Sequence, residues 1–197
     1  NTGAYSNTGG QASTSSFLGQ DSDLASVGAA HAGKTDDRKE LGLIAAFHPK
    51  VMVVQSTPAM QGHFLKNVLT ALDYRDGPVV IDVHTPCQGE NGIGDAVASG
   101  HARLAVRSRV SPLFVHDPRV EPSARARLSL AGNPDAEQDW TTVELEWDDA
   151  DGVTQTMEVP LTPADFAHEE GRFKKQFQPR PLADDVAGVP IHEWIDL

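Results

Sequence analysis

The chain has 197 residues, and its 28 acidic side chains against 16 basic ones give a net charge of −12. Such an acidic balance argues against nucleic acid and anionic membranes as partners, because both select for a basic surface. A hydrophobic content of 39% excludes a wholly disordered chain, and no apolar run reaches the roughly 20 residues of a membrane span. One cysteine excludes an internal disulfide, and no CxxC motif is present to build a metal or redox site unaided.

The first 40 residues are rich in glycine, serine, threonine and asparagine, with few apolar residues to anchor a regular element. Their composition predicts loops or a mobile terminus. The chain opens on asparagine rather than methionine, and no signal peptide is recognisable. We therefore expect a cytoplasmic protein, of which this chain is a piece.

Regular structure is expected from residue 41 onward. Leu41–Ala46 suits a short helix, and the β-branched run at residues 51–54 suits a buried strand. Apolar residues between 60 and 72 then recur at helical spacing, and Val79–Val83 forms the next strand. A strand, a helix and a strand in this order predict a parallel pair with a right-handed crossover.

The single cysteine, Cys87, falls in the loop that follows the second of these strands. Open parallel sheets place their ligand sites beyond the carboxyl ends of strands. A lone cysteine is more often a small buried apolar residue than a ligand, so the local pattern leaves both roles open.

The second half of the chain has a different pattern of apolar and polar residues. We expect a helix over residues 89–104, an extended stretch over 111–118 and a linker or surface loop over 120–140. Alternating apolar residues on both sides of an aspartate-rich turn predict a β-hairpin with a five-residue loop between 141 and 161. Thr162 and Pro163 then cap a helix that runs to residue 177. Its phenylalanines, Phe166, Phe173 and Phe177, are expected to face the body of the protein.

Eight histidines are present, but no HxH or HExxH spacing supports a zinc site. His31 and His84 lie in segments near the candidate site, where they could tune the protonation of a bound cofactor. The alternative for both is a solvated or capping histidine.

Residues 2–11 read Thr-Gly-Ala-Tyr-Ser-Asn-Thr-Gly-Gly-Gln, and residues 77–87 read Gly-Pro-Val-Val-Ile-Asp-Val-His-Thr-Pro-Cys. Together these stretches resemble the thiamine diphosphate-binding domain of pyruvate:ferredoxin (flavodoxin) oxidoreductases. The similarity covers roughly residues 1–119. It implies an α/β fold, the C-terminal part of a thiamine diphosphate-binding domain with a parallel sheet flanked by helices. We expect three parts: this domain (1–119), the linker (120–140), and an extension of hairpin, helix and tail (141–197).

The resemblance also implies site residues. A magnesium ion would bind the Thr2 hydroxyl and the main-chain carbonyl of Ala4, and hard oxygen ligands suit that ion. Asn7 would act in catalysis by lining the cofactor and substrate pocket. The cofactor-binding stretch comprises Thr2, Ala4, Ser6, Asn7, Thr8, Gly9, Gly10 and Gln11. Cys87 would supply one of the four thiolates of a [4Fe–4S] cluster, with the other ligands outside this chain.

The activity implied is oxidative decarboxylation of a pyruvate-type 2-oxoacid to an acyl-CoA, with electrons passed through iron–sulfur clusters to ferredoxin or flavodoxin. The implied partners are the 2-oxoacid, coenzyme A, and the rest of the same polypeptide or sister subunits, in a dimer. This chain alone is expected to be inactive.

The sequence also departs from the family pattern. Asn1, Gly3 and Ala4 replace Asp, Glu and Val, and residues 13–23 diverge. These changes favour an alternative, a catalytically degenerate structural or interaction module that retains the fold.

Overall fold

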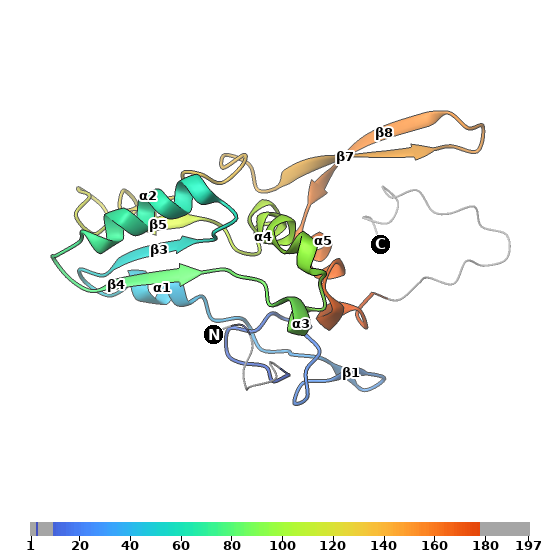
Figure 1. Ribbon diagram of the computed structural model, residues 1–197, viewed down its shortest axis with the longest axis horizontal. Helices are drawn as coiled ribbons and strands as arrows, with labels where there is room; N and C mark the ends of the chain where they lie inside the picture. Colours follow the sequence, from blue (N-terminus) through green and yellow to red (C-terminus); the bar gives the residue numbers. More distant parts are fainter. Residues whose placement is uncertain (1–2, 4–9, 178–197) are drawn as a thin grey trace.

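Strand β3 (Met52–Ser56) is buried along its whole length in the computed structural model of the chain, which describes residue 3 and residues 10–177 (Figure 1). It pairs in parallel with β4 (Val79–Val83) and antiparallel with β5 (Phe114–His116). The short strand β6 (Leu128–Ser129) adds to the far side of β5, giving the order β4-β3-β5-β6. The α/β prediction is confirmed. The sheet is mixed, because only β3 and β4 are parallel.

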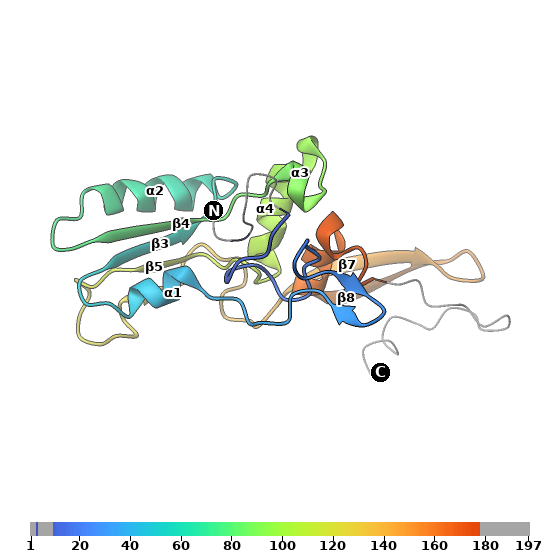
Figure 2. The same cartoon turned by 90° about the horizontal axis from the view of Figure 1, so that it is seen from below.

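Helices cover both faces of this sheet. Figure 2 shows α1 (Leu41–Ala46) and α2 (Gln61–Leu72) on opposite sides of it. Neighbouring residues of a strand point to opposite faces, and the core is accordingly split in two. One cluster contains Met52, Val54, Ala71 and Tyr74, and the other contains Ala45, Val51, Val53 and Phe114.

The register of the parallel pair determines where the loops lie. Ser56, the last residue of β3, lies beside Val83, the last residue of β4. One hydrogen bond continues beyond the pair, because the His84 backbone N–H donates to the Ser56 carbonyl at 2.9 Å. Both strands therefore end at one edge of the sheet, and the segment that carries Cys87 leaves from that edge.

The helix predicted over residues 89–104 is wrong as a continuous element. The segment contains α3 (Gln88–Asn91), a 3₁₀ turn η1 (Asp95–Val97) and α4 (Ala98–Arg107). The break follows α3 at Gly92, whose φ of 66° lies in the left-handed region that glycine adopts most readily.

The predicted β-hairpin is confirmed as β7 (Thr141–Asp148) and β8 (Thr154–Leu161), joined by five residues. Thr162 caps the next helix, α5 (Pro163–His168), through a capping box with Asp165. The prediction that this helix reaches residue 177 is wrong. It ends at His168, and a separate 3₁₀ turn, η2 (Gly171–Phe173), follows.

The burial of the three phenylalanines follows that break. Phe166 and Phe173 are buried as predicted, whereas Phe177 lies beyond η2 and is 38% exposed. α5 packs near α4 on the side of the molecule from which the hairpin projects (Figure 1).

The N-terminal segment consists mainly of loops, as predicted, with a small ladder of β1 (Val27–Gly28) and β2 (His31–Ala32). The three-part division at residues 119 and 140 stays a prediction, and the tail over 178–197 lies outside the described residues. Within the part of the chain that the structure describes, no helix has the length and apolar character to cross a membrane.

Replacement of Met52 by alanine should destabilise the fold. Met52 is fully buried between the sheet and α2, so truncation removes packed methylene groups and leaves a cavity. We expect the free energy of unfolding to fall by about 2 to 5 kcal/mol in urea denaturation. Met157→Ala is the matched control, since Met157 lies half-buried on the projecting hairpin. Equal losses in both variants would contradict the placement of β3 at the centre.

Candidate functional site

A cavity of about 740 Å³ lies beyond the carboxyl end of β4, and its volume is in the range of small-molecule sites. The described residues of its wall come from the N-terminal loops, α1 with the residues before it, the stretch from the end of β4 through α3, the segment before β5, and η2. The residues on which the argument below depends are Gly3, Phe17, Arg38, His84, Cys87 and Arg172.

Cys87 lies at this cavity, at the N-terminal end of α3. Its side chain is exposed and its thiol is free. The expectation that it follows a parallel strand is confirmed, because β4 ends at Val83 and pairs in parallel with β3. The exposure of the thiol beside a cavity agrees with a role as a ligand and disagrees with a role as a small buried apolar residue.

Most residues of the predicted thiamine motif lie outside the described part of the chain, namely Thr2, Ala4, Ser6, Asn7, Thr8 and Gly9. The residues that flank them are placed. Gly3 lines the cavity, and its carbonyl accepts a 2.7 Å hydrogen bond from the Ser16 hydroxyl. The Gly10 carbonyl accepts from the Asp23 backbone N–H at 2.8 Å, and a Cβ on Gly10 would meet the Asp23 carboxylate at 2.9 Å. Gln11 is described but does not line this cavity.

The metal-binding potential of the described residues is limited. In residue 3 and residues 10–177, no group of three or more His, Cys, Asp or Glu side chains is placed to hold a metal ion. Cys87 can therefore contribute one thiolate to a cluster, and a [4Fe–4S] cluster needs four. The donor set fits a shared cluster only if other segments supply the remaining ligands.

His84 forms part of the cavity wall and packs edge-on against the Phe166 ring, with 6.1 Å between the ring centroids. Its Nε2 is buried and has no hydrogen-bond partner among the described residues. Burial lowers the pKa of His84 to about 4, so the ring is neutral at pH 7. His31, the other histidine considered from the sequence, lies exposed on β2 and does not line this cavity.

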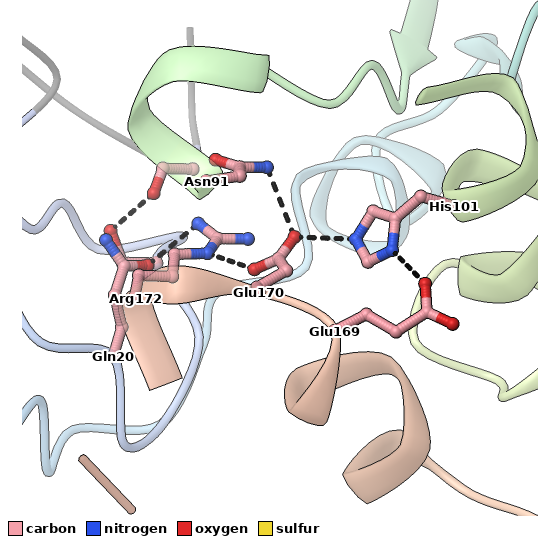
Figure 3. A network of polar contacts seen from close by, with 8 residues as sticks. Gln20, Asn91, His101, Glu169, Glu170 and Arg172 are labelled. Carbon is pink, nitrogen blue, oxygen red and sulfur yellow. Dashed lines mark hydrogen bonds and ion pairs between the residues drawn. The ribbon is translucent and has the colours of Figure 1, made fainter. Parts of the chain in front are cut away.

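A buried polar network lies behind the cavity wall (Figure 3). Its centre is the Glu170 carboxylate, whose side chain is fully buried. Glu170 Oε1 accepts hydrogen bonds from Asn91 Nδ2 at 3.1 Å and from His101 Nε2 at 2.9 Å, and Oε2 pairs with the Arg172 guanidinium. The other ring nitrogen of His101 lies 3.1 Å from Glu169 Oε2.

Both nitrogens of His101 therefore face carboxylate oxygens, which only accept hydrogen bonds. Burial is the largest influence on the pKa of His101 and lowers it, but the hydrogen bonds and charges of Glu170 and Glu169 together raise the pKa above its ordinary value. The ring also stacks on Phe166, with 4.4 Å between the centroids. Phe166 thus contacts one histidine that favours the charged form and one that favours the neutral form.

Two arginines that line the cavity place their guanidinium groups against the ring of Phe17, which also lines it. The guanidinium carbon of Arg38 lies 4.5 Å from the centre of that ring, and that of Arg172 lies 5.0 Å from it. Arg172 Nη1 also donates to Gln20 Oε1 at 3.0 Å. A cation over an aromatic face is attracted by the ring quadrupole, so Phe17 helps to hold both positive charges beside the cavity.

Sequence reasoning identified Cys87 and His84 but missed the network. Asn91, His101, Glu169, Glu170 and Arg172 come from three separate elements and follow no motif spacing. The only local signal is the pair of adjacent glutamates, which in isolation is typical of a solvated surface.

No protein-family model matches the chain. Among curated proteins, it is 30% identical over 136 residues, or 69% of the chain, to a probable pyruvate-flavodoxin oxidoreductase of Escherichia coli. It is 32% identical over 60% of its length to a pyruvate:ferredoxin oxidoreductase of Moorella thermoacetica. It is also 32% identical over 56% of its length to the pyruvate synthase subunit PorB of Thermotoga maritima.

These matches cover small parts of the relatives. The matched region corresponds to 11% of the Escherichia coli protein and 10% of the Moorella thermoacetica protein, but to 34% of the Thermotoga maritima subunit. The chain therefore corresponds to about a tenth of the two longer relatives and a third of the shorter one.

The difference in stability between the native chain and His101→Gln should depend on pH. A folded-state pKa above the ordinary 6.5 means that the contribution of His101 is complete below pH 6.5 and is lost as the pH rises through the folded-state value. We expect the free energy of unfolding of the native chain to exceed that of His101→Gln by about 1 to 3 kcal/mol at pH 6. Urea unfolding from pH 6 to pH 9 should show this difference shrinking. A constant difference would contradict a charged His101.

His84 should give the opposite dependence. Its folded-state pKa of about 4 lies below the ordinary 6.5, so the unfolded chain binds the proton first and stability falls as the pH drops from 6.5 toward 4. At about 1.4 kcal/mol per pKa unit, the loss reaches up to about 3 kcal/mol. Thermal unfolding of His84→Phe should lack this component of acid sensitivity, and His48→Phe, at an exposed histidine, should retain it.

Proposed function

Because this chain belongs to the family of pyruvate:ferredoxin and pyruvate:flavodoxin oxidoreductases, we propose that it forms one wall of the thiamine diphosphate site of such an enzyme. The larger protein would oxidatively decarboxylate a pyruvate-type 2-oxoacid to an acyl-CoA. Thiamine diphosphate, when bound, supplies the electron sink for decarboxylation, and iron–sulfur clusters carry electrons onward.

One observation carries this proposal: Gly3 and Cys87 line the same cavity. Gly3 lies inside the stretch that resembles the thiamine-binding motif, and Cys87 is the residue that, by the same resemblance, would ligate a cluster. These two residues are far apart in the sequence. Their common cavity supports the proposal that both belong to one site.

In this proposal the chain's own residues have distinct tasks. The Thr2 hydroxyl and the Ala4 carbonyl bind Mg²⁺, which suits their hard oxygen donors. Asn7 contacts the reacting groups. The backbone of Gly9 and Gly10 allows the cofactor to approach closely. Ser6, Thr8 and Gln11 complete the cofactor-binding stretch, and Cys87 ligates one iron of a [4Fe–4S] cluster.

The cavity wall carries both cationic and anionic side chains, because Asp82 and Glu90 line it together with Arg38 and Arg172. Arg38 and Arg172 place two cations over Phe17 at the cavity, and the neutral ring of His84 adds no charge of its own. A diphosphate, a 2-oxoacid carboxylate and coenzyme A are all anions that a guanidinium group can bind. In the structure Arg38 pairs with Glu40 and Arg172 with Glu170, so an anionic ligand would share these two cations with carboxylates.

The proposed partners follow from the family. They are the 2-oxoacid, coenzyme A, ferredoxin or flavodoxin, and the remaining polypeptide or sister subunits of a dimeric, cytoplasmic enzyme. Within it, residues 1–119 would complete the thiamine diphosphate-binding domain, 120–140 would link it onward, and 141–197 would form the extension.

Replacement of Cys87 by serine should remove one cluster from the full-length protein that contains this chain. Loss of one thiolate ligand should lower the iron content by about four atoms per protein, with thiamine content retained. Iron analysis and electron paramagnetic resonance of the reduced protein measure this loss. Thr85→Ser, two residues away at the same cavity, is the matched control.

Two outcomes would contradict the proposal in different ways. Unchanged iron in Cys87→Ser would exclude this residue as a ligand. A folded native protein that contains neither thiamine nor iron would instead favour the catalytically degenerate module.

A further inference from the structure

We propose that the segment from Glu169 to Phe173 positions the turn that carries Cys87, through the hydrogen bond of Asn91 to Glu170 and the contact of Gly92 with Gly171. Its importance for electron transfer rests on the proposed ligand role of Cys87. The positioning itself can be tested without any cofactor.

Cys87 and Asn91 are the two ends of one helical turn. The Asn91 backbone N–H donates to the Cys87 carbonyl at 2.8 Å, and α3 contains only four residues. A helix this short is unstable in isolation, because a single turn fixes many dihedral angles for few hydrogen bonds. Its geometry must therefore come from contacts with the rest of the molecule.

The first such contact is polar and buried. Asn91 is 7% exposed, and its Nδ2 donates to Glu170 Oε1 at 3.1 Å. The acceptor is itself held from two sides, by His101 on α4 and by Arg172 on η2 (Figure 3). Asn91 is thus bonded to an oxygen that cannot move without breaking the pairing of a buried charge.

The second contact brings two backbones together. A Cβ on Gly92 would lie 2.8 Å from the Gly171 Cα and 3.0 Å from its nitrogen. A Cβ on Gly171 would lie 3.2 Å from the Gly92 Cα. Only hydrogen atoms fit between these residues, so the end of α3 lies directly against the start of η2.

These two contacts hold the C-terminal end of α3, and through it they bear on the position of the thiol. On the other side of Cys87, the chain is held by the end of β4 and the hydrogen bond from His84 to Ser56, and the Cys87 side chain is exposed. Ligand groups of a metal site depend on surrounding contacts for their orientation. Asn91 and Gly171 are therefore positioning residues, acting on the site through the backbone of α3.

A spin label on Cys87 tests this directly, since it is the single cysteine of the 197-residue chain. Nitroxide spectra report nanosecond mobility in the folded state, which a change in global stability alone does not alter. We expect Asn91→Ala and, independently, Gly171→Ala to narrow the central line and shorten the rotational correlation time of the label.

Each variant has a matched control. Asn67→Ala removes an asparagine on α2 whose side chain donates to the His63 carbonyl of the same helix at 2.8 Å. Gly89→Ala adds a Cβ to α3 itself, where it would meet nothing within 4 Å. Neither control should increase the mobility of the label.

Folded variants with unchanged spectra would overturn the proposal, and so would equal mobility in the controls. Should Asn91→Ala fail to fold, Gly171→Ala, which leaves the buried charges paired, decides the matter. In the full-length protein, Asn91→Ala should also shift the reduction potential of the cluster. Absence of any cluster in the native protein would contradict the proposed function, while the spin-label result would still stand.

Discussion

The buried carboxylate of Glu170 is the constraint on which the arrangement of the site depends. A charge removed from water is costly unless ion pairs and hydrogen bonds replace its hydration. Here His101, Arg172 and Asn91 fill that role, and they belong to α4, η2 and α3. Arg172 extends the same network to Gln20 in the N-terminal loops. Satisfying one carboxylate therefore draws four segments together, and three of them (α3, η2 and the N-terminal loops) contribute residues to the cavity wall.

The two histidines on Phe166 illustrate how environment determines protonation. Both contact the same ring and both are largely shielded from water. His101 has two carboxylates as partners and is favoured in its charged form, whereas His84 has a buried nitrogen with no described partner and is neutral. The positive charge of His101 also disfavours protonation of His84. The charged histidine therefore lies in the buried network behind the cavity wall, and the neutral one lies in the wall itself.

The sequence predicted well wherever local pattern and tertiary environment agree. β4 matched its predicted bounds because a β-branched run follows a Gly-Pro turn, and α2 matched closely because its apolar residues recur at helical spacing. The apolar residues of this helix form a stripe that is only partly buried, since Leu65, Leu69 and Leu72 are at least 60% exposed. The stripe is wider than the sheet surface that α2 covers. The helix expected over 89–104 failed because Gly92 adopts a left-handed conformation against Gly171, a long-range contact that composition does not report. The network around Glu170 could not be predicted for the same reason.

The pairing of Arg172 with Gln20 has a consequence for the order in which the molecule is assembled. These residues are 152 positions apart, and the contact between Asn91 and Glu170, which lies within that span, joins residues 79 positions apart. During synthesis, the sheet and its two covering helices can form as soon as β5 has emerged, because their contacts are closer in sequence. The cavity cannot close until η2 has followed. Its wall therefore acquires native structure only after the sheet, and chains that end before η2 carry Cys87 on an unsupported turn.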